Sequence, residues 1–506
     1  MKQSGKVVLA GAGPGDPDLA TVALMKALPQ ADVVVYDYLA NEELLRHAPQ
    51  AEKICVGKRA GAHSWKQPAI NSLLLKLAAK GKTVLRLKGG DPYVFGRGGE
   101  EALVLEKAGV PFEVLPGVTS GVAALAYAGI PLTHRSLATA AVFVTGQERS
   151  GKPLSAATLR ALAKLDATLV FYMATAHADR VCKALIRAGR PPKTPAALVH
   201  KGTLPGQKVV TSTLRDLASS MAAANLGAPG LIVIGKVVGL RDKLDWFESK
   251  PLFGRRILVT RSREQASRLS EGLRALGAEV LEAPSIRIQA LKPSPTLLKK
   301  IPQCRWLVLT SANGVSALFE NLGRIGLDAR SLAKVRIAAI GESTAQALKE
   351  HGLLADLVPK TFVAEDLSSS LIKKDGKHLR GSLVILARAS QGRSVLPQAL
   401  QQVGAKVLDL PLYETLADKS QAERLNREIL AGHLDWVTFT SSSTVDFFEA
   451  QLSPAARAAS LRSLGALCLG PITRARAESA GYKVLLESPQ ASIPVFLTAI
   501  QKHAGR

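Results

Sequence analysis

The sequence predicts an α/β protein of two domains, the second of which is built from two similar lobes. In the first half, short apolar segments of strand length alternate with segments of helical periodicity, an order typical of α/β domains. In the second half, a set of segments recurs after 127 to 130 residues, which indicates an internal repeat. The length of 506 residues suits about three or four folding units of this kind.

The first half divides into two sets of elements, which we expect in the following order. The first set has strands at 6–10, 31–36 and 83–87 and helices at 20–28, 71–79 and 99–108. The second set has strands at 141–145, 168–172, 196–199 and 231–238 and helices at 158–165 and 178–188. Residues 239–254 are charged and lack apolar periodicity, so the domain boundary is expected there, with domains over 1–248 and 249–506.

The repeat in the second half matches three pairs of segments. The pairs are 257–261 with 384–388, 306–311 with 436–441, and 341–344 with 470–473. Each lobe is therefore expected to hold a parallel sheet. Loops rich in Thr, Ser and Gly would lie at the carboxyl edge of that sheet, where open sheets bind ligands. A cleft between the two lobes is the expected ligand site.

The charge of the chain narrows the classes of partner. There are 66 Lys and Arg against 41 Asp and Glu, a formal net charge of +25, spread as +13 over residues 1–250 and +12 over 251–506. Nucleic acid, anionic membrane and acidic small molecules all suit such a charge. Because aromatic residues make up only 5% and no basic block is present, we expect no nucleic acid as partner.

The sequence shows none of the usual signals of a membrane protein or of a metal site. No apolar run reaches the ~18–20 residues of a membrane span, and residues 1–20 do not have the pattern of a signal peptide. The four cysteines are far apart, and the nine histidines show no metal-ligand spacing. We therefore expect a cytoplasmic protein with no metal and no membrane partner.

A glycine-rich turn, Gly11-x-Gly13-Pro14-Gly15-Asp16, follows the first strand. Its spacing differs from the G-x-G-x-x-G fingerprint of dinucleotide sites. Asp16 puts a negative charge where a pyrophosphate would sit. A ligand without such phosphates, for example a sulfonium compound, or else a nucleotide sugar, fits better. A plain tight turn is the alternative.

Asp37 and the loop at 58–64 are further candidates. Asp37 follows a buried strand, where it could bind a ribose hydroxyl, accept a proton, or simply face solvent. Lys58 and Arg59 share a loop with His63, and such a loop can hold carboxylates. A solvated basic loop is the alternative for these residues.

Two more loops join a strand end to glycines and polar residues. One is Gly89-Gly90-Asp91, whose paired glycines would let the backbone approach a ligand closely, while Asp91 could accept hydrogen bonds from it. The other runs over 116–120 and contains Thr119 and Ser120. Three loops of this kind in one domain are hard to explain as turns alone.

Short hydroxyl side chains recur in the second half at Thr310-Ser311, Thr344, Thr440-Ser441 and Thr473. Together with backbone N–H groups they could hold carboxylates, whereas the simpler interpretation is capping of helix N-termini. Tyr413 follows Pro411 and is either half-buried or directed into the predicted cleft.

The motifs of residues 5–247 closely resemble those of S-adenosylmethionine-dependent uroporphyrinogen-III C-methyltransferases. They are GAGPGDP, VVYDYL, VGKRAGAHS, RLKGGDPYVFGRGGEE, PGVTSGVAALAYAGIPLTHR and FYM. Gln147 departs from the family, which usually has His there. The resemblance implies a two-subdomain tetrapyrrole methylase fold, S-adenosyl-L-methionine as cofactor, S-adenosyl-L-homocysteine as its product, and a homodimer formed through this domain.

Residues 254–500 resemble uroporphyrinogen-III synthases, through the two-lobe repeat, the paired G-x-x-T loops and Pro-Leu-Tyr-Glu. The resemblance implies two α/β lobes with parallel sheets, about 255–287 with 416–506, and about 293–410.

The two resemblances imply consecutive reactions on tetrapyrrole octacarboxylates. The second domain would close linear hydroxymethylbilane to uroporphyrinogen III with inversion of ring D. The first would methylate that product at C2 and C7 to give precorrin-2, on the route to sirohaem or cobalamin. An alternative is a later corrin-ring methyltransferase fused to a non-catalytic tetrapyrrole-binding module.

The resemblances also imply roles for particular residues. Asp37 corresponds to a proton acceptor and Lys58 to a proton donor, and Tyr413, Thr344 and Thr473 correspond to synthase residues proposed to assist ring closure. Cofactor-binding positions fall on Pro14, Gly89, Gly90, Asp91, Val94, Thr119, Ser120, Met173 and Gly202.

Overall fold

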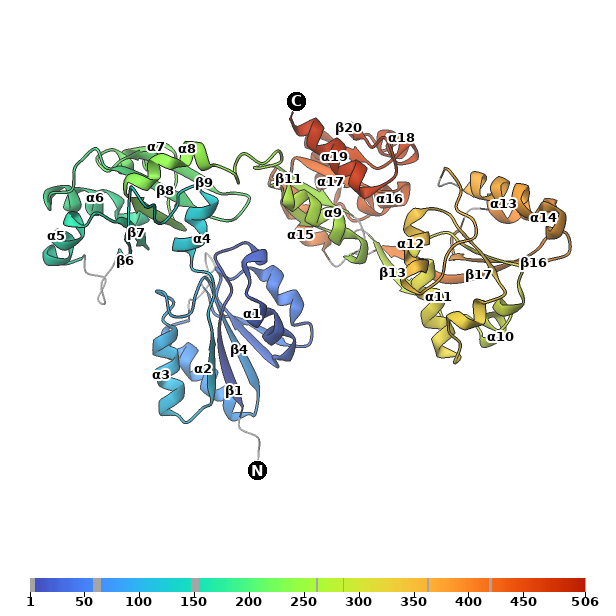
Figure 1. The fold of residues 1–506 in the computed structure, drawn as a ribbon, viewed down its shortest axis with the longest axis horizontal. Coiled ribbons are helices and arrows are strands. Elements are labelled where there is room, and N and C mark those ends of the chain that lie inside the picture. The colour runs from blue at the N-terminus through green and yellow to red at the C-terminus, as the bar shows by residue number, and fades with distance from the viewer. Residues whose placement is uncertain are drawn as a thin grey trace. The chain divides into compact units, whose positions relative to one another are not determined.

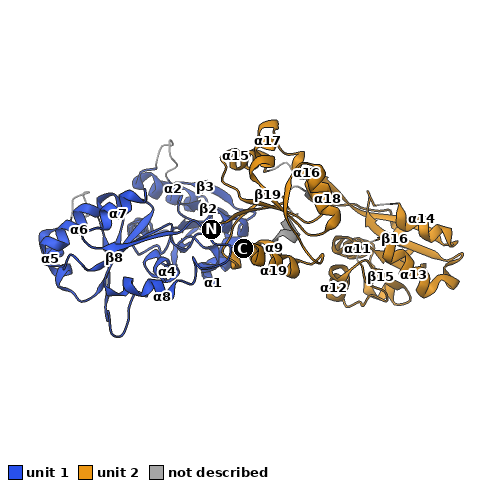
Figure 2. Ribbon diagram, turned by 90° about the horizontal axis from the view of Figure 1, so that it is seen from above, with its two compact units in different colours: residues 1–254 blue, residues 255–506 orange. Residues whose placement is uncertain are grey.

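The computed structural model describes residues 5–57, 65–146, 154–260, 263–284, 286–361, 364–392, 394–417 and 421–505. The chain divides into two compact units, residues 1–254 and 255–506, coloured separately in Figure 2. Each unit contains two five-stranded sheets with helices around them (Figure 1). The predicted α/β class is therefore confirmed.

The first sheet of unit 1 is entirely parallel, in the order β3-β2-β4-β1-β5. Its strands are β1 (Lys6–Gly11), β2 (Val33–Tyr36), β3 (Glu52–Cys55), β4 (Thr83–Lys88) and β5 (Phe112–Leu115). Its helices are α1 (Val22–Ala27), α2 (Gln67–Ala79) and α3 (Gly98–Lys107), with short 3-10 helices at Pro17–Leu19, Leu28–Gln30 and Glu42–His47. Val7 and Leu9 of β1 pack with α2 and α3, while Val8 and Ala10 pack on the opposite face with α1, as the alternation of a strand requires.

The second sheet of unit 1 is mixed, in the order β6-β7-β10-β8-β9. Its strands are β6 (Ala141–Thr145), β7 (Thr168–Tyr172), β8 (Pro195–His200), β9 (Lys208–Thr213) and β10 (Gly230–Ile234). Only β6 and β7 pair in parallel. The helices are α4 (Ser120–Tyr127), α5 (Ala156–Lys164), α6 (Ala178–Arg187), α7 (Leu217–Ala223) and α8 (Arg241–Leu244), with 3-10 helices at Thr175–His177 and Lys236–Leu240.

The structure corrects some of the elements expected in unit 1. Strands β3, β5 and β9 were not predicted, because each is partly exposed and lacks a continuous apolar run. The strand expected at 231–238 stops at Ile234, since Gly235 leads directly into a 3-10 helix.

Residues 239–254, which were expected only to mark a boundary, pack against unit 1. Phe247 and Leu252 are buried, and the Phe247 ring lies 4.7 Å from that of Tyr127. The indole Nε1 of Trp246 donates to the carbonyl of Ala126 at 2.9 Å. These contacts make the segment the last part of unit 1, which ends at Gly254.

The first sheet of unit 2 is parallel, in the order β12-β11-β18-β19-β20, and takes its strands from both ends of the unit. They are β11 (Arg256–Val259), β12 (Glu279–Glu282), β18 (Trp436–Phe439), β19 (Gly465–Cys468) and β20 (Lys483–Glu487). Its helices are α9 (Arg263–Ala275), α15 (Ala422–Leu430), α16 (Ser442–Glu449), α17 (Pro454–Ser463), α18 (Pro471–Ser479) and α19 (Ile493–Ala504).

The second sheet of unit 2 has the order β13-β17-β16-β14-β15. Its strands are β13 (Ile286–Ala290), β14 (Trp306–Leu309), β15 (Arg336–Ala339), β16 (Leu383–Ala389) and β17 (Lys406–Ala417). Its helices are α10 (Pro295–Leu298), α11 (Ala312–Arg324), α12 (Glu342–Glu350), α13 (Ala364–Leu379) and α14 (Val395–Gln402), with 3-10 helices at Ile301–Gln303 and Ala329–Leu332. The expected parallel sheet is found in β14 to β17, with one departure at its edge, where β13 runs antiparallel to β17.

Within the described ranges, no helix combines the length and the apolar character that crossing a bilayer requires.

Candidate active sites

Three glycine loops of unit 1 touch backbone to backbone at the carboxyl edge of the first sheet. Gly13 and Gly90 exchange two hydrogen bonds, of 3.2 Å and 2.7 Å. A Cβ atom on Gly117 would lie 2.2 Å from the carbonyl oxygen of Gly90 and 2.7 Å from Cα of Gly11. Gly117 therefore has to be glycine, because a side chain there would push the loops apart. Gly13 and Gly90 instead have left-handed backbones, with φ of 77° and 68°, which glycine adopts without strain.

Asp91 fastens two of these loops together. Its Oδ1 accepts from the backbone N–H of Tyr93 at 2.7 Å, and its Oδ2 accepts from that of Gly117 at 3.0 Å. Both carboxylate oxygens are thus engaged by the chain itself. Beside them, a Cβ on Gly89 would lie 3.1 Å from that of Leu39, but a Cβ on Gly90 would approach nothing closer than 3.8 Å. This leaves an open backbone surface next to Asp91.

The second sheet contributes Tyr172, at the end of β7, and the loop that follows it. The Tyr172 hydroxyl lies 2.8 Å from Oγ1 of Thr119 and accepts the backbone N–H of Gly121 at 2.7 Å. Thr119 and Ser120 therefore begin α4 in a position fixed by β7. Met173 comes next, with its side chain more than half exposed and a left-handed backbone (φ 54°). Such a backbone conformation is strained in a residue that is not glycine.

The remaining cofactor positions lie around these loops. Pro14 is half-buried between Gly13 and Gly15, and Val94 is half-buried against the core that includes α4. A Cβ on Gly202 would lie 2.3 Å from that of Ala124, so the turn after β8 packs directly on α4. The nine positions predicted to bind the cofactor thus lie on or next to the loops that join the two sheets of unit 1.

Asp16 has a structural use that the sequence did not show. Its Oδ1 accepts the N–H of Asp18, and its Oδ2 accepts the Tyr127 hydroxyl at 2.8 Å. Its own N–H donates to Oγ1 of Thr203 at 3.1 Å. Burial, reinforced by the hydrogen bond to Asp16, raises the pKa of Tyr127, which keeps that phenol protonated. The turn after β1 is therefore tied to the second sheet.

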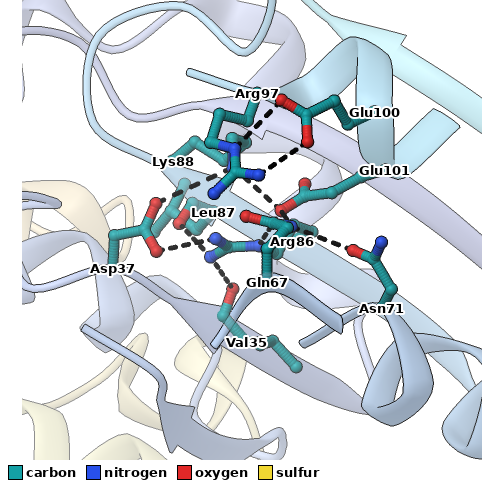
Figure 3. A network of polar contacts seen from close by, with 10 residues as sticks. All are labelled: Val35, Asp37, Gln67, Asn71, Arg86, Leu87, Lys88, Arg97, Glu100 and Glu101. Carbon is teal, nitrogen blue, oxygen red and sulfur yellow. Dashed lines mark hydrogen bonds and ion pairs between the residues drawn. The ribbon is translucent and has the colours of Figure 1, made fainter. Parts of the chain in front are cut away.

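Asp37 belongs to a cluster of four charged side chains at the ends of β2 and β4 (Figure 3). Its Oδ1 lies 2.6 Å from the Arg86 guanidinium, and its Oδ2 lies 3.9 Å from Nζ of Lys88. Glu101 of α3 lies 3.0 Å from Nζ of Lys88 and 3.3 Å from Nε of Arg86. The Asp37 side chain is 31% exposed, whereas those of the other three are at most 3% exposed.

Burial lowers the pKa of Lys88, and the neighbouring Arg86 cation lowers it further, while Glu101 and Asp37 act against both effects. Arg86 and Lys88 had no role in the sequence analysis. A signal was present, since two cations interrupt the apolar strand TVLRLK at alternate positions, on one face of a buried element.

The predicted proton donor Lys58 lies outside the described residues, as do Arg59, His63 and Gln147. Among the described residues, no group of three or more His, Cys, Asp or Glu side chains could hold a metal ion.

In unit 2 the predicted hydroxyl set separates into two kinds. Ser311 and Ser441 cap the N-termini of α11 and α16, which agrees with the simpler interpretation. Thr344 and Thr473 instead occupy the third position of helices whose N-cap is glycine. Thr344 is buried, and its Oγ1 has no hydrogen-bond partner among the described residues.

Tyr413 lies on β17 and is 7% exposed. Its hydroxyl is 2.8 Å from Oγ of Ser311, and burial raises its pKa. The phenol is therefore held neutral at the start of α11, where the backbone N–H groups of a helix favour negative charge. This arrangement suits a group that donates a hydrogen bond to an oxygen atom.

Comparison with known proteins assigns the two units separately. The family model for tetrapyrrole (corrin/porphyrin) methylases matches residues 6–218, and the model for uroporphyrinogen-III synthase HemD matches residues 267–497. A porphyrin biosynthesis protein HemD of Ruminiclostridium josui is 40% identical over 472 residues, 92% of each chain. A uroporphyrinogen-III C-methyltransferase of Bacillus subtilis is 38% identical over 71% of this chain and 74% of its own.

A crystal structure of uroporphyrin-III C-methyltransferase from Thermus thermophilus, complexed with S-adenosyl homocysteine, aligns with 46% of this chain and 99% of its own. The identity is 41% and the TM-score is 0.41.

Proposed function

This chain belongs to the family of proteins that join a tetrapyrrole methylase to a uroporphyrinogen-III synthase, and from that premise we propose the two reactions that it catalyses. Residues 255–506 convert hydroxymethylbilane to uroporphyrinogen III. Residues 1–254 then methylate this product at C2 and C7, which gives precorrin-2. The chain is thus a bifunctional enzyme of tetrapyrrole biosynthesis.

S-adenosyl-L-methionine is the methyl donor that fits unit 1. The open backbone of Gly90 beside Thr119 can accept a flat, uncharged nucleoside closely. The carboxylates of Asp16 and Asp91 lie along the same loops and disfavour a pyrophosphate. When bound, this cofactor supplies an electrophilic methyl group and leaves as S-adenosyl-L-homocysteine. The same nine positions, from Pro14 to Gly202, are proposed to hold it.

Asp37 is the residue on which this proposal for unit 1 depends most. An electron-rich pyrrole carbon can take the methyl group directly, so the protein has to position the ring and remove a proton. Asp37 is the one member of its charged cluster that reaches the surface, and the hydrogen bond from Arg86 at 2.6 Å fixes the position of its carboxylate. It is therefore suited to accept the proton that the methylated ring loses and to release it to water. Lys58 is proposed as the proton donor.

Ring closure in unit 2 requires loss of water from the hydroxymethyl group. We assign assistance of this step to Tyr413, whose neutral hydroxyl can donate to the departing oxygen. Thr344 and Thr473 are proposed to contact the substrate with their hydroxyl groups. Thr344 supports this assignment, since its buried hydroxyl has no partner among the described residues, and a buried hydroxyl left unpaired is energetically costly.

We further propose that the enzyme is cytoplasmic, that it forms a homodimer through unit 1, and that its precorrin-2 supplies sirohaem or cobalamin synthesis. No nucleic acid or membrane takes part in the proposed reactions.

The whole chain incubated with hydroxymethylbilane and S-adenosyl-L-methionine tests the proposal. We expect precorrin-2 with two equivalents of S-adenosyl-L-homocysteine, and uroporphyrinogen III alone when the methyl donor is left out. Production of uroporphyrinogen I in both arms would contradict the synthase activity. Unmethylated uroporphyrinogen III in the complete mixture would contradict the methylase activity.

A further inference from the structure

The cluster around Asp37 contains two cations and two carboxylates and is electrically balanced when all four groups are ionised. Arg86 and Lys88 come from β4, Glu101 comes from α3, and Asp37 follows β2. Only Asp37 reaches solvent. Buried charges interact through a medium that screens them weakly, so the charges of the other three side chains all act on Asp37.

Glu101 acts on Asp37 only at a distance. Its Oε1 accepts from Lys88 at 3.0 Å, from Gln67 at 3.0 Å and from Arg86 at 3.3 Å. Its Oε2 is buried and has no hydrogen-bond partner among the described residues. A fully buried carboxylate held in this way is costly, and it is seldom found without paired cations. It therefore has a use beyond the packing of α3, which an apolar residue would serve better.

That use follows from the positions of the two cations. Arg86 and Lys88 both lie between Glu101 and Asp37, so each cation is shared by two carboxylates (Figure 3). With Glu101 ionised, the attraction that the cations exert on Asp37 is partly offset. Without it, two unshared cations would hold Asp37 as a weak base. Without Lys88, Asp37 would face Glu101 with only one cation between them.

We propose that Glu101 and Lys88 are positioning residues that set the basicity of Asp37 for methyl transfer. The inference rests on the proposed function, in which Asp37 accepts a proton. In that step the ring carbon gains the methyl group, the carbon–sulfur bond breaks with its electron pair left on sulfur, and the ring proton passes to the Asp37 carboxylate. Burial and then the neighbouring Arg86 cation lower the pKa of Lys88, while Glu101 and Asp37 raise it, so Lys88 interacts with every other member of the cluster.

A second ion pair and a neutral amide lie beside the cluster. Arg97 and Glu100, at the start of α3, form a largely exposed ion pair at 2.7 Å, and Arg97 also attracts Glu101 electrostatically. Gln67 of α2 is neutral and is shared between Glu101 and Asn71. Among the described residues, Arg86 and Lys88 are the cations that pair with Asp37, and Glu101 is the carboxylate that shares both of them.

The test is the pH dependence of kcat/KM for uroporphyrinogen III in the full-length enzyme, whose acidic limb reports the ionisation of Asp37. Glu101→Gln should move this limb to lower pH by about one unit, and Lys88→Met should move it to higher pH by about one unit. The double variant, which loses one charge of each sign, should return the limb close to its original position. Glu106→Gln, an exposed charge change on the same helix, serves as the matched control and should leave the limb unmoved.

Opposite shifts with restoration in the double variant would support the proposal. The proposal would be overturned if the acidic limbs of both single variants moved in the same direction, or did not move, while the variants still bound S-adenosyl-L-methionine. A merely structural role would lower the rate without moving the two limbs in opposite directions. If Lys88→Met does not fold, Lys88→Gln keeps a donor to Glu101 and carries the same expectation. If Asp37 is not the base at all, the Asp37→Asn variant would retain the acidic limb. This result distinguishes a failure of the proposed function from a failure of the positioning role of Glu101 and Lys88.

Discussion

The hydroxyl of Tyr172 lies 2.8 Å from Oγ1 of Thr119, and this contact joins the end of β7 to the N-cap residue of α4. The same hydroxyl accepts the backbone N–H of Gly121. One phenol from the second sheet therefore fixes the loop that completes the proposed cofactor site, although 53 residues separate the two side chains.

Replacement of Tyr172 by Phe removes both hydrogen bonds and should loosen this loop. Each such bond is worth about 0.5–1.5 kcal/mol, so we expect Kd for S-adenosyl-L-methionine to rise about tenfold. Calorimetric titration measures the change. Ring closure by unit 2 of the same chain is the internal control and should be unaffected. Unchanged cofactor affinity would contradict the role given to this tyrosine.

Gly117→Ala should abolish cofactor binding with unit 2 still active. The added Cβ would meet the carbonyl of Gly90 at 2.2 Å and Cα of Gly11 at 2.7 Å, and these backbone atoms cannot move aside separately. Gly239→Ala is the control, because a Cβ there meets nothing within 4 Å. A titration that finds equal affinity in both variants would show that the glycine crossing is dispensable.

Tyr413→Phe should slow ring closure about tenfold, since hydrogen-bond donation by a neutral phenol to the leaving oxygen is lost. Hydroxymethylbilane that is not processed closes spontaneously to the type I isomer, so the ratio of type III to type I product should fall. Tyr482→Phe removes a buried phenol of the same unit that hydrogen-bonds to Glu449, and it serves as control. An unaltered isomer ratio in Tyr413→Phe would rule out the assignment.

Asp375 makes unit 2 sensitive to acid. It is 4% exposed and accepts hydrogen bonds from Arg305 and from the indole of Trp306. The Arg305 hydrogen bond, more than that of Trp306, lowers the pKa of Asp375 from 3.8 to about 2. A carboxylate whose pKa is lower in the folded than in the unfolded state stabilises the fold at pH values above the unfolded pKa. For Asp375 this contribution is about 2 kcal/mol, and it is lost as the pH falls toward about 2.

Thermal unfolding of unit 2 at pH 2 to 5 measures this effect. Asp375→Asn should lower Tm above pH 4, and the difference from the parent chain should shrink as the pH falls. Asp328→Asn alters an exposed carboxylate that pairs with Arg330 and should change Tm little. A difference that stays constant with pH would be contrary to this prediction.

The net charge of +25 predicts salt-dependent binding of the anionic substrates. Raising ionic strength from about 0.05 to 0.5 M should raise KM for hydroxymethylbilane and for uroporphyrinogen III severalfold, because screening weakens long-range attraction. KM for S-adenosyl-L-methionine, which is not polyanionic, provides the comparison. Constant KM values for both tetrapyrroles would assign the excess charge to solubility alone.

Local signals in the sequence predicted the glycine loops, the strands with continuous apolar runs and the repeat of unit 2. They did not predict β9, whose sequence KVVTST forms a half-exposed strand only because β8 lies beside it. The capping roles of Ser311 and Ser441 could be anticipated as an alternative, whereas the buried position of Thr344 depends on tertiary packing.

The cluster around Asp37 is a second case in which tertiary packing, and not a local sequence pattern, decides which residues take part. Arg86 and Lys88 were visible in the sequence as cations in an apolar strand. Their partner Glu101 lies on a helix 13 residues beyond Lys88, and nothing in a helical pattern distinguishes it from its neighbour Glu100. Only the packing of α3 on the sheet shows that one is buried and the other is not.

Strand β11 pairs with β18, which lies about 180 residues later in the chain, while β13 to β17 form a complete sheet between them. During synthesis on the ribosome, all strands of the inserted sheet are therefore made before β18. Until residues 436–487 have been synthesised, β11 and β12 lack the other three strands of their sheet. We expect the lobe in the middle of unit 2 to fold first. A nascent chain that stops before β18 would expose the apolar side chains of β11 and β12. We expect chaperones to bind this exposed pair of strands.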